Sequence, residues 1–145
     1  MVKIEKNDIG RCIHILSRQT KRKIDEAVSS YHVTAVQCDF IGFIAKKNKK
    51  GRVYAKDIER RFNMRRATVA EILSLMEKNG LIERKSRSED ARLKEILLTD
   101  KSLEIKKNID KEIKKVEKTL RKGLTEEELK NFKNILDKMS KNLEE

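Results

Sequence analysis

The sequence contains no proline and no tryptophan, and only 5 of its 145 residues are glycine. Proline is the strongest helix breaker, so its absence favours long, uninterrupted helices. No apolar run approaches the ~18 residues that a membrane-spanning helix needs. The first ten residues, MVKIEKNDIG, also lack the apolar core of a secretory signal. We therefore expect a soluble, cytoplasmic protein with no membrane partner.

Cysteine and histidine are also scarce, because Cys12, His14, His32 and Cys38 are the full set. Two cysteines do not make a disulfide framework. Cys12 and His14 are two residues apart on an expected helix, so they point to different faces, and no Cys-x-x-Cys or His-x-x-x-His pair occurs. The spacing predicts no metal site, and we expect no cofactor. The sequence also lacks a glycine-rich phosphate loop and a Ser-His-Asp grouping, so we expect no enzyme.

Aromatic residues make up only 4% of the chain, which argues against an RNA binder that stacks single-stranded bases. Charge, in contrast, is abundant: 41% of the residues are charged, and the formal net charge is +12. Residues 46–66 alone carry +8, from ten Lys or Arg residues and two acids. A focused positive charge is typical of a surface that meets phosphates, although a solvated lysine-rich surface is the alternative interpretation.

The length of the chain predicts one domain, residues 1–145. Helical periodicity predicts helices over 8–30, 35–46, about 55–61, about 66–79, and two more after Thr99. Asp8 is an expected N-cap, and Thr34-Gln37 and Thr125-Glu128 are expected capping boxes. Two strands are expected at 81–85 and 93–98. The last two helices carry apolar stripes, which we assign to Leu103, Ile109, Ile113, Val116 and Leu120, and to Leu129, Phe132, Leu136, Met139 and Leu143.

The middle of the chain combines a short helix, a tight turn at 62–65, a longer helix and a hairpin. This order predicts a mainly α fold, a winged helix-turn-helix with a two- or three-stranded wing. The second helix of such a pair enters the DNA major groove with its N-terminal residues at the base edges. A cation at that helix start opposes the helix dipole, a conflict that a phosphate would remove. The expected DNA contacts of this helix are Arg65, Arg66, Ala67, Thr68 and Glu71.

The hairpin 82–98 is the expected wing, and SRSEDAR forms its tip. Arg87 and Arg92 can reach a narrow minor groove, where the negative potential is strongest. Asp90 can pair with Arg92 and fix its direction. We include Ser88 in the wing contacts. Phosphate contacts are expected from Arg52, Lys56 and Lys85.

The stretch NGLIERKSRSEDARLKEILLT, residues 79–99, resembles the MarR family of transcription regulators. The matching positions are Gly80-Leu81, Arg84, Asp90-x-Arg92 and Leu98-Thr99. The resemblance extends over the helix TAVQCDFIGFIA and, more weakly, over both ends of the chain. One departure is Leu93, where the family usually has a second basic residue, so leucine removes one possible bond to a phosphate. The recognition helix RRATVAE lies where family members differ most, so no operator sequence can be inferred.

The resemblance implies a homodimer formed through the first helix and the last two, residues 1–33 and 100–145. Residues 34–99 would form the DNA-binding part, with the helix-turn-helix at about 54–77. It also implies a small aromatic or phenolic effector, for which Tyr31, Phe40 and Phe43 are the candidate stacking partners. Some members sense peroxide through a cysteine of the first helix, which makes Cys12 a redox candidate, although a small core residue is the simpler interpretation.

We therefore expect a sequence-specific regulator of transcription that binds double-stranded DNA. The favoured form is a homodimeric repressor of pseudo-palindromic operators, relieved by a small ligand. Two alternatives remain open at this point. The winged helix could serve as a protein-interaction or architectural module without a specific operator, or the regulator could sense redox state through Cys12.

Overall fold

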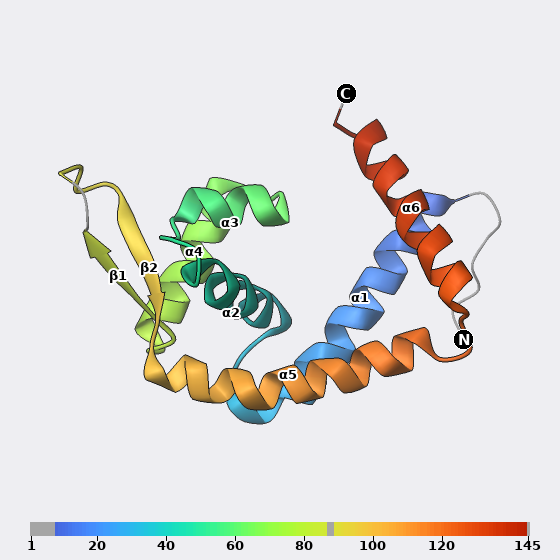
Figure 1. The fold of residues 1–145 in the computed structure, drawn as a ribbon, viewed down its shortest axis with the longest axis horizontal. Helices are drawn as coiled ribbons and strands as arrows, with labels where there is room; N and C mark the ends of the chain where they lie inside the picture. Colours follow the sequence, from blue (N-terminus) through green and yellow to red (C-terminus); the bar gives the residue numbers. More distant parts are fainter. Residues whose placement is uncertain (1–7, 87–88, 145) are drawn as a thin grey trace.

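The computed structural model describes residues 8–86 and 89–144 (Figure 1). Arg87 and Ser88, two of the expected wing contacts, lie outside these ranges. The expected element boundaries agree with the structure to within two residues. No helix in the described ranges is long and apolar enough to cross a membrane. The elements in chain order are α1 (Ile9–Val28), a 3-10 turn (Ser29–Tyr31), α2 (Ala35–Asn48), α3 (Ala55–Phe62), α4 (Arg66–Lys78), β1 (Ile82–Ser86), β2 (Lys94–Leu98), α5 (Asp100–Arg121) and α6 (Glu126–Asn142).

The expected helix caps are present as hydrogen bonds. The carboxylate of Asp8 accepts the backbone N–H of Arg11 at 3.0 Å. Thr34 and Gln37 cap each other reciprocally, at 3.2 and 3.1 Å, at the start of α2. The Thr125–Glu128 pair does the same at the start of α6, at 3.1 and 2.8 Å. These local signals fix where the helices begin because they satisfy amides that no intrahelical carbonyl can reach.

The head of the molecule contains α2, α3, α4 and the hairpin, while α1, α5 and α6 extend away from it (Figure 1). α5 leaves the hairpin and runs along one side of the molecule to the far end, where α6 turns back. Apolar residues from α2, α3, α4 and the hairpin meet in one buried core, to which α1 and α5 contribute Val28 and Ile109. The head is therefore well packed, whereas the far ends of α1 and α6 lie outside this core.

The wing is a two-stranded antiparallel sheet, in which Ile82 pairs with Leu98 and Arg84 with Ile96. The backbone N–H of Ile96 also donates to the carbonyl of Val53 at 2.8 Å. This backbone bond ties the 52–54 segment to the sheet without making it a strand. Of the two versions that the sequence allowed, the two-stranded wing is confirmed.

The predicted stripe on α5 is wrong at Leu103. Ile109 is buried, but Leu103 lies six residues earlier, about 1.7 turns, and so faces another direction. The buried face at that level is formed by Ser102, whose hydroxyl donates to the carbonyl of Leu81. Leu103 is instead 46% exposed. The apolar pattern misplaced Leu103 because it counts only apolar residues, whereas a buried serine with a backbone acceptor takes the inward position.

Candidate nucleic-acid interface

The turn between α3 and α4 places the second helix on the surface of the head. Asn63 takes a left-handed conformation with φ of 49°, and the N–H of Met64 closes the helix end on the carbonyl of Glu59 at 3.0 Å. Asp57 holds the other end of α3 by accepting the N–H of Tyr54 at 2.8 Å. A backbone hydrogen bond thus closes the turn after α3, and a side-chain cap holds the start of the same helix.

Asp57 also joins α3 to α2, because its carboxylate lies 2.6 Å from the Lys47 ammonium. Burial acts to raise the pKa of Asp57, but the hydrogen bonds from Lys47 and from the Tyr54 amide outweigh burial and lower this pKa. Asp57 therefore stays charged at neutral pH and holds α3 against α2.

The first turn of α4 presents positive charge to solvent. Arg65, Arg66, Ala67 and Thr68 are exposed, and so is Glu71 one turn later. Arg65 occupies the N-cap position with no side-chain cap, and the first turn holds no acid. Among the described residues, no carboxylate lies within ion-pair distance of Arg65 or Arg66. The opposite face of α4 buries Val69, Leu73 and Met76 in the core, which fixes the direction of the exposed face.

The wing tip holds Arg92 in a defined direction. The carboxylate of Asp90 accepts the backbone N–H of Arg92 at 3.0 Å and its guanidinium Nε at 3.4 Å. The Arg92 side chain is nevertheless 92% exposed. The pairing expected from the sequence is therefore present, and it leaves the far nitrogens of Arg92 facing solvent.

Arg84 has a structural contact that the sequence pattern did not reveal. Its guanidinium donates to both carboxylate oxygens of Glu77, at 3.1 and 3.2 Å, and approaches the Ser74 hydroxyl at 3.5 Å. These contacts fasten the first wing strand to the last turns of α4. The hydrogen bond from Arg84 is also the largest influence on Glu77 and lowers its pKa.

The three expected phosphate contacts differ in their surroundings. Lys56 is exposed on the first turn of α3. Lys85 lies on the wing, 3.7 Å from the carboxylate of Glu83. The guanidinium of Arg52 lies 3.9 Å from the carboxylate of Glu95, which is buried. Arg52 therefore has a structural partner that its sequence position gave no sign of.

Two cavities bear on the expected ligand contacts. One, of about 490 Å³, lies between α2, α3 and α5, and Phe43 and Phe62 form its aromatic wall. Phe40 is fully buried against Phe62, with ring centroids 5.4 Å apart, so its assignment as a ligand-stacking residue is wrong. The other is an apolar groove of about 760 Å³ between α1 and α6. Tyr31 is half-buried and lines neither of them.

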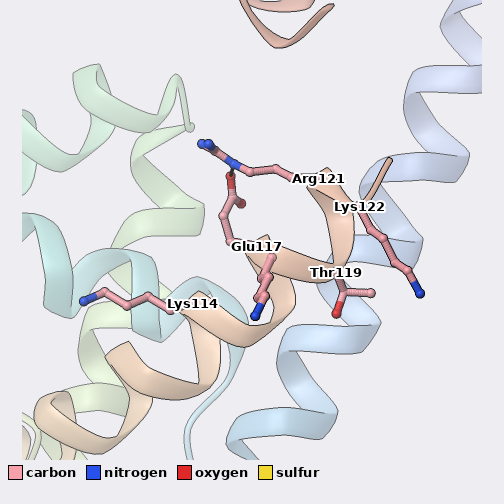
Figure 2. A pocket seen from close by; sticks show the side chains of 6 residues that line it. Lys114, Glu117, Thr119, Arg121 and Lys122 are labelled. Atoms are coloured by element: carbon pink, nitrogen blue, oxygen red, sulfur yellow. Dashed lines mark hydrogen bonds and ion pairs between the residues drawn. The ribbon is translucent and has the colours of Figure 1, made fainter. Parts of the chain in front are cut away.

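A shallow hollow at the end of α5 is the most cationic of the cavities. Figure 2 shows its side chains splayed apart, with Lys114 and Lys122 pointing away from each other. Arg121 turns back to Glu117, and their closest atoms are 2.8 Å apart. Because the lysines diverge, this hollow does not focus charge on a single point.

The two cysteines lie in different environments. Cys38 is buried in the core, where burial raises the pKa of its thiol to about 12. Cys12 is half-buried and lines the α1–α6 groove. Within residues 8–86 and 89–144, no group of three or more His, Cys, Asp or Glu side chains is arranged to hold a metal ion.

Comparisons with known proteins agree with this geometry. A family model described as the MarR family matches residues 32–93. The crystal structure of the transcription regulator MarR from Oenococcus oeni is 28% identical with a TM-score of 0.77, over 92% of this chain and 99% of that one. The MepR–DNA complex from S. aureus is 24% identical with a TM-score of 0.85, over 96% and 99%. A MarR protein from Peptoclostridium difficile is 24% identical with a TM-score of 0.84, over 99% and 92%. A search of curated protein sequences found no significant match.

Proposed function

Since the chain belongs to the MarR family of winged helix transcription regulators, we propose that it is a homodimeric repressor that binds pseudo-palindromic operator DNA and is released by a small ligand. The family and the fold support the coarser statement, a DNA-binding transcription regulator. Repression, dimerisation and ligand release are the finer parts of the proposal.

The observation that carries DNA binding is the uncapped, doubly cationic start of α4. Arg65 and Arg66 stand where the helix dipole is positive, so each adds like charge that costs about 0.3–1 kcal/mol near a helix start. A DNA phosphate relieves that repulsion, because helix N-termini and guanidinium groups both bind phosphate oxygens. Arg92, held by Asp90, supplies a second contact from the wing. The structure solved for MepR is a DNA complex of the same fold.

Exposed apolar side chains on α1 and α6 support a homodimer. Ile9, Ile13 and Leu16 of α1, and Phe132 and Ile135 of α6, are each 43–53% exposed. Clustered apolar surface of this kind marks an interface more often than free surface. Residues 1–33 and 100–145 would thus form the dimerisation part, and 34–99 the DNA-binding part. Twofold symmetry would place the half-sites about 10 bp apart.

The cavity between α2, α3 and α5 supports ligand release. Its aromatic wall, Phe43 and Phe62, lies beside Lys47 and Arg61, whose cations are 5.9 and 5.4 Å from the ring centroids. Aromatic faces next to cations suit a small aromatic or phenolic anion. Since α3 belongs to the helix-turn-helix, a ligand here can change the position of α4 relative to α5.

The proposal is tested by fluorescence anisotropy with labelled duplex from the intergenic region beside the gene, against scrambled duplex, at several salt concentrations. We expect tight, site-preferring binding that weakens steeply with salt. Equal, weak binding to both duplexes would contradict an operator in that region and favour the architectural alternative. Addition of a phenolic acid to the specific complex then tests ligand release.

A further inference from the structure

A fourth cavity, of about 510 Å³, lies where α2, β2 and α5 meet. It is on a different face of α2 from the cavity walled by Phe43 and Phe62, which we call the aromatic cavity. Three leucines line it, Leu97 and Leu98 from β2 and Leu103 from α5. Three lysines complete its rim, Lys49 from the end of α2 and Lys106 and Lys107 from α5. We call this cavity the leucine pocket. Its volume lies within the ~300–1,000 Å³ of small-molecule sites.

The leucines are more exposed here than core packing would leave them. Leu103 is 46% exposed, and Leu97 and Leu98 are half-buried. A single exposed leucine is ordinary, but three leucines around one hollow give it a largely apolar lining. The core does not account for Leu103, because Ser102 takes the buried position at that turn of α5.

The rim carries uncompensated positive charge. The ammonium of Lys106 lies 2.6 Å from the carboxylate of Asp110, which neutralises it. Lys49 and Lys107 are exposed, and no carboxylate of the described chain lies within ion-pair distance of either. An apolar wall beside two free ammonium groups is complementary to a molecule with a hydrocarbon body and one anionic end.

The lining also indicates what kind of hydrocarbon fits. No aromatic residue lines the leucine pocket, whereas two phenylalanines line the aromatic cavity. We propose that the leucine pocket binds a medium-chain aliphatic carboxylate, with its chain against Leu97, Leu98 and Leu103 and its carboxylate near Lys49 and Lys107. This makes it a ligand site separate from the aromatic cavity.

The position of the pocket gives such a ligand a route to the wing. β2 is the second wing strand, and Thr99, which follows it, caps α5 and donates its hydroxyl to the carbonyl of Gly80 at 2.6 Å. The pocket wall therefore spans the root of the wing and the first turns of α5. A ligand that binds one wing position more tightly than another shifts the population towards it. This regulatory consequence rests on the proposed DNA binding, but the binding of the carboxylate does not.

The test is a titration of the full chain with octanoate, followed by NMR of methyl-labelled leucine and isoleucine in the absence of DNA. We expect saturable shifts of the Leu97, Leu98 and Leu103 methyls. Absence of saturable shifts at these three residues overturns the proposal. Shifts confined to Leu16 and Leu136, in the α1–α6 groove, overturn it as well.

Variants test separately how the pocket recognises the carboxylate and how it recognises the hydrocarbon chain. Lys107→Glu should weaken octanoate roughly three- to tenfold, a modest factor because the ammonium is exposed. Lys114→Glu, the same change on the same helix outside the pocket, should leave the affinity unchanged. Leu103→Asp should abolish the shifts while the melting temperature stays close to that of the wild type. Equal weakening by both lysine variants, or equally tight binding of 1-octanol, would overturn carboxylate recognition.

Measuring DNA affinity with and without octanoate distinguishes failure of this inference from failure of the proposed function. If octanoate binds and changes DNA affinity in the wild type but not in Lys107→Glu, the regulatory consequence holds. If octanoate binds and the protein shows no specific DNA affinity, the proposed function fails and the ligand site stands. If octanoate binds without changing DNA affinity, the regulatory consequence fails alone.

Discussion

At the scale of single residues, the two cysteines differ in their burial. Burial raises the pKa of Cys38 to about 12, so its thiolate is about 10,000-fold less populated than the thiol at pH 8. Cys12 lines the α1–α6 groove and is half-buried. Cys12 therefore remains the candidate redox residue. The buried Cys38 thiol is excluded as a group that could react with it.

We predict that a thiol reagent such as 5,5′-dithiobis-(2-nitrobenzoate) modifies Cys12 and leaves Cys38 unmodified in the folded protein at pH 8. Denaturation should release the second thiol. The reaction of Cys12→Ser and Cys38→Ser variants, followed by absorbance, identifies which thiol reacts. Rapid labelling of native Cys12→Ser would show that the buried assignment of Cys38 is wrong.

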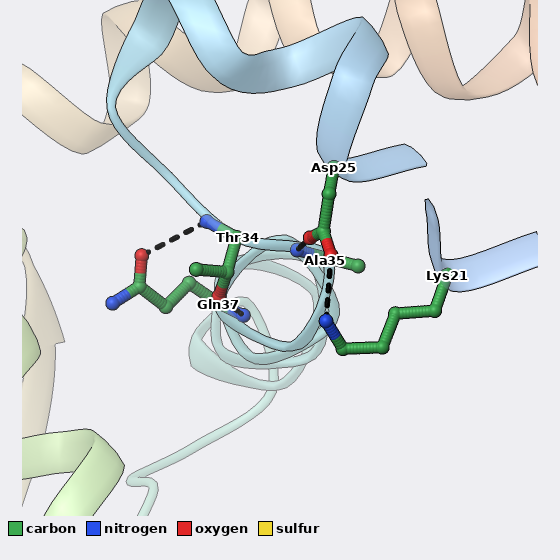
Figure 3. A network of polar contacts seen from close by, with 5 residues as sticks. All are labelled: Lys21, Asp25, Thr34, Ala35 and Gln37. Carbon is green, nitrogen blue, oxygen red and sulfur yellow. Dashed lines mark hydrogen bonds and ion pairs between the residues drawn. The ribbon is translucent and has the colours of Figure 1, made fainter. Parts of the chain in front are cut away.

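At the scale of secondary-structure elements, a long-range cap joins α1 to the head. Figure 3 shows Asp25 of α1 facing the start of α2, where it accepts the backbone N–H of Ala35 at 2.7 Å. The ammonium of Lys21 donates to the same carboxylate at 2.6 Å. Thr34 and Gln37 cap the rest of that helix start. α1 is thus held to the head by this carboxylate as well as by the buried Val28.

We predict that Asp25→Asn lowers the free energy of unfolding by about 1 kcal/mol at pH 7. Burial acts to raise the pKa of Asp25, but the bonds from Lys21 and Ala35 outweigh it and lower this pKa below its ordinary 3.8. A lowered pKa contributes stability above pH 3.8 that is lost as the pH falls through the folded value. Urea unfolding at pH 7 and pH 3 should show the difference between wild type and variant shrinking at the lower pH. A difference that stays constant would contradict the charged cap.

A second link between elements is the bidentate pair of Arg84 and Glu77, which fastens β1 to α4. We predict that Arg84→Ala speeds amide hydrogen exchange in β1 and β2 and costs only about 0.5 kcal/mol, since both groups are partly exposed. Arg84→Lys should behave like the alanine variant, because lysine lacks the two-pronged geometry. Hydrogen exchange measured without DNA tests this directly. Unchanged exchange in Arg84→Ala, with Lys133→Ala as the control, would show that the pair does not hold the wing.

The sequence predicted these elements well where the signal was local. Helix starts at Asp8, Thr34 and Thr125 could be predicted because an N-cap and its partner lie within three residues. The bonds of Asp25 to Ala35 and of Arg84 to Glu77 could not, because they join residues ten and seven positions apart on different elements. The face of Leu103 was missed for a related reason. Hydrophobicity alone does not show that Ser102 has a buried backbone acceptor.

At the scale of the whole molecule, exposed apolar residues of α1 and α6 line one groove of about 760 Å³. We predict that Phe132→Asp converts the proposed dimer into monomers, measured by sedimentation velocity over a range of concentrations. Leu93→Asp, a change at an equally exposed apolar residue of the wing, should leave the dimer intact. A wild-type protein that sediments as a monomer at all concentrations would contradict the homodimer.

The sequence predicted the exposure of the proposed DNA contacts better than the lining of the cavities. Arg65, Arg66 and Arg92 are exposed as predicted, because charged residues at a helix start and a hairpin tip are seldom buried. Cavities depend on how distant elements pack. Phe62 therefore lines the aromatic cavity unpredicted, and Phe40, a predicted ligand contact, lies in the core.

The most direct test of the central claim is the salt dependence of operator binding by the wild type and by a triple variant, Arg65→Ala, Arg66→Ala and Arg92→Ala. The logarithm of the binding constant falls with the logarithm of salt concentration by about 0.9 for each phosphate neutralised. We predict that the variant binds at least tenfold more weakly and that its slope is shallower by about 2–3, since each arginine removed leaves one phosphate without its cation. Wild-type affinity with an unchanged slope would show that the start of α4 and the wing do not face DNA.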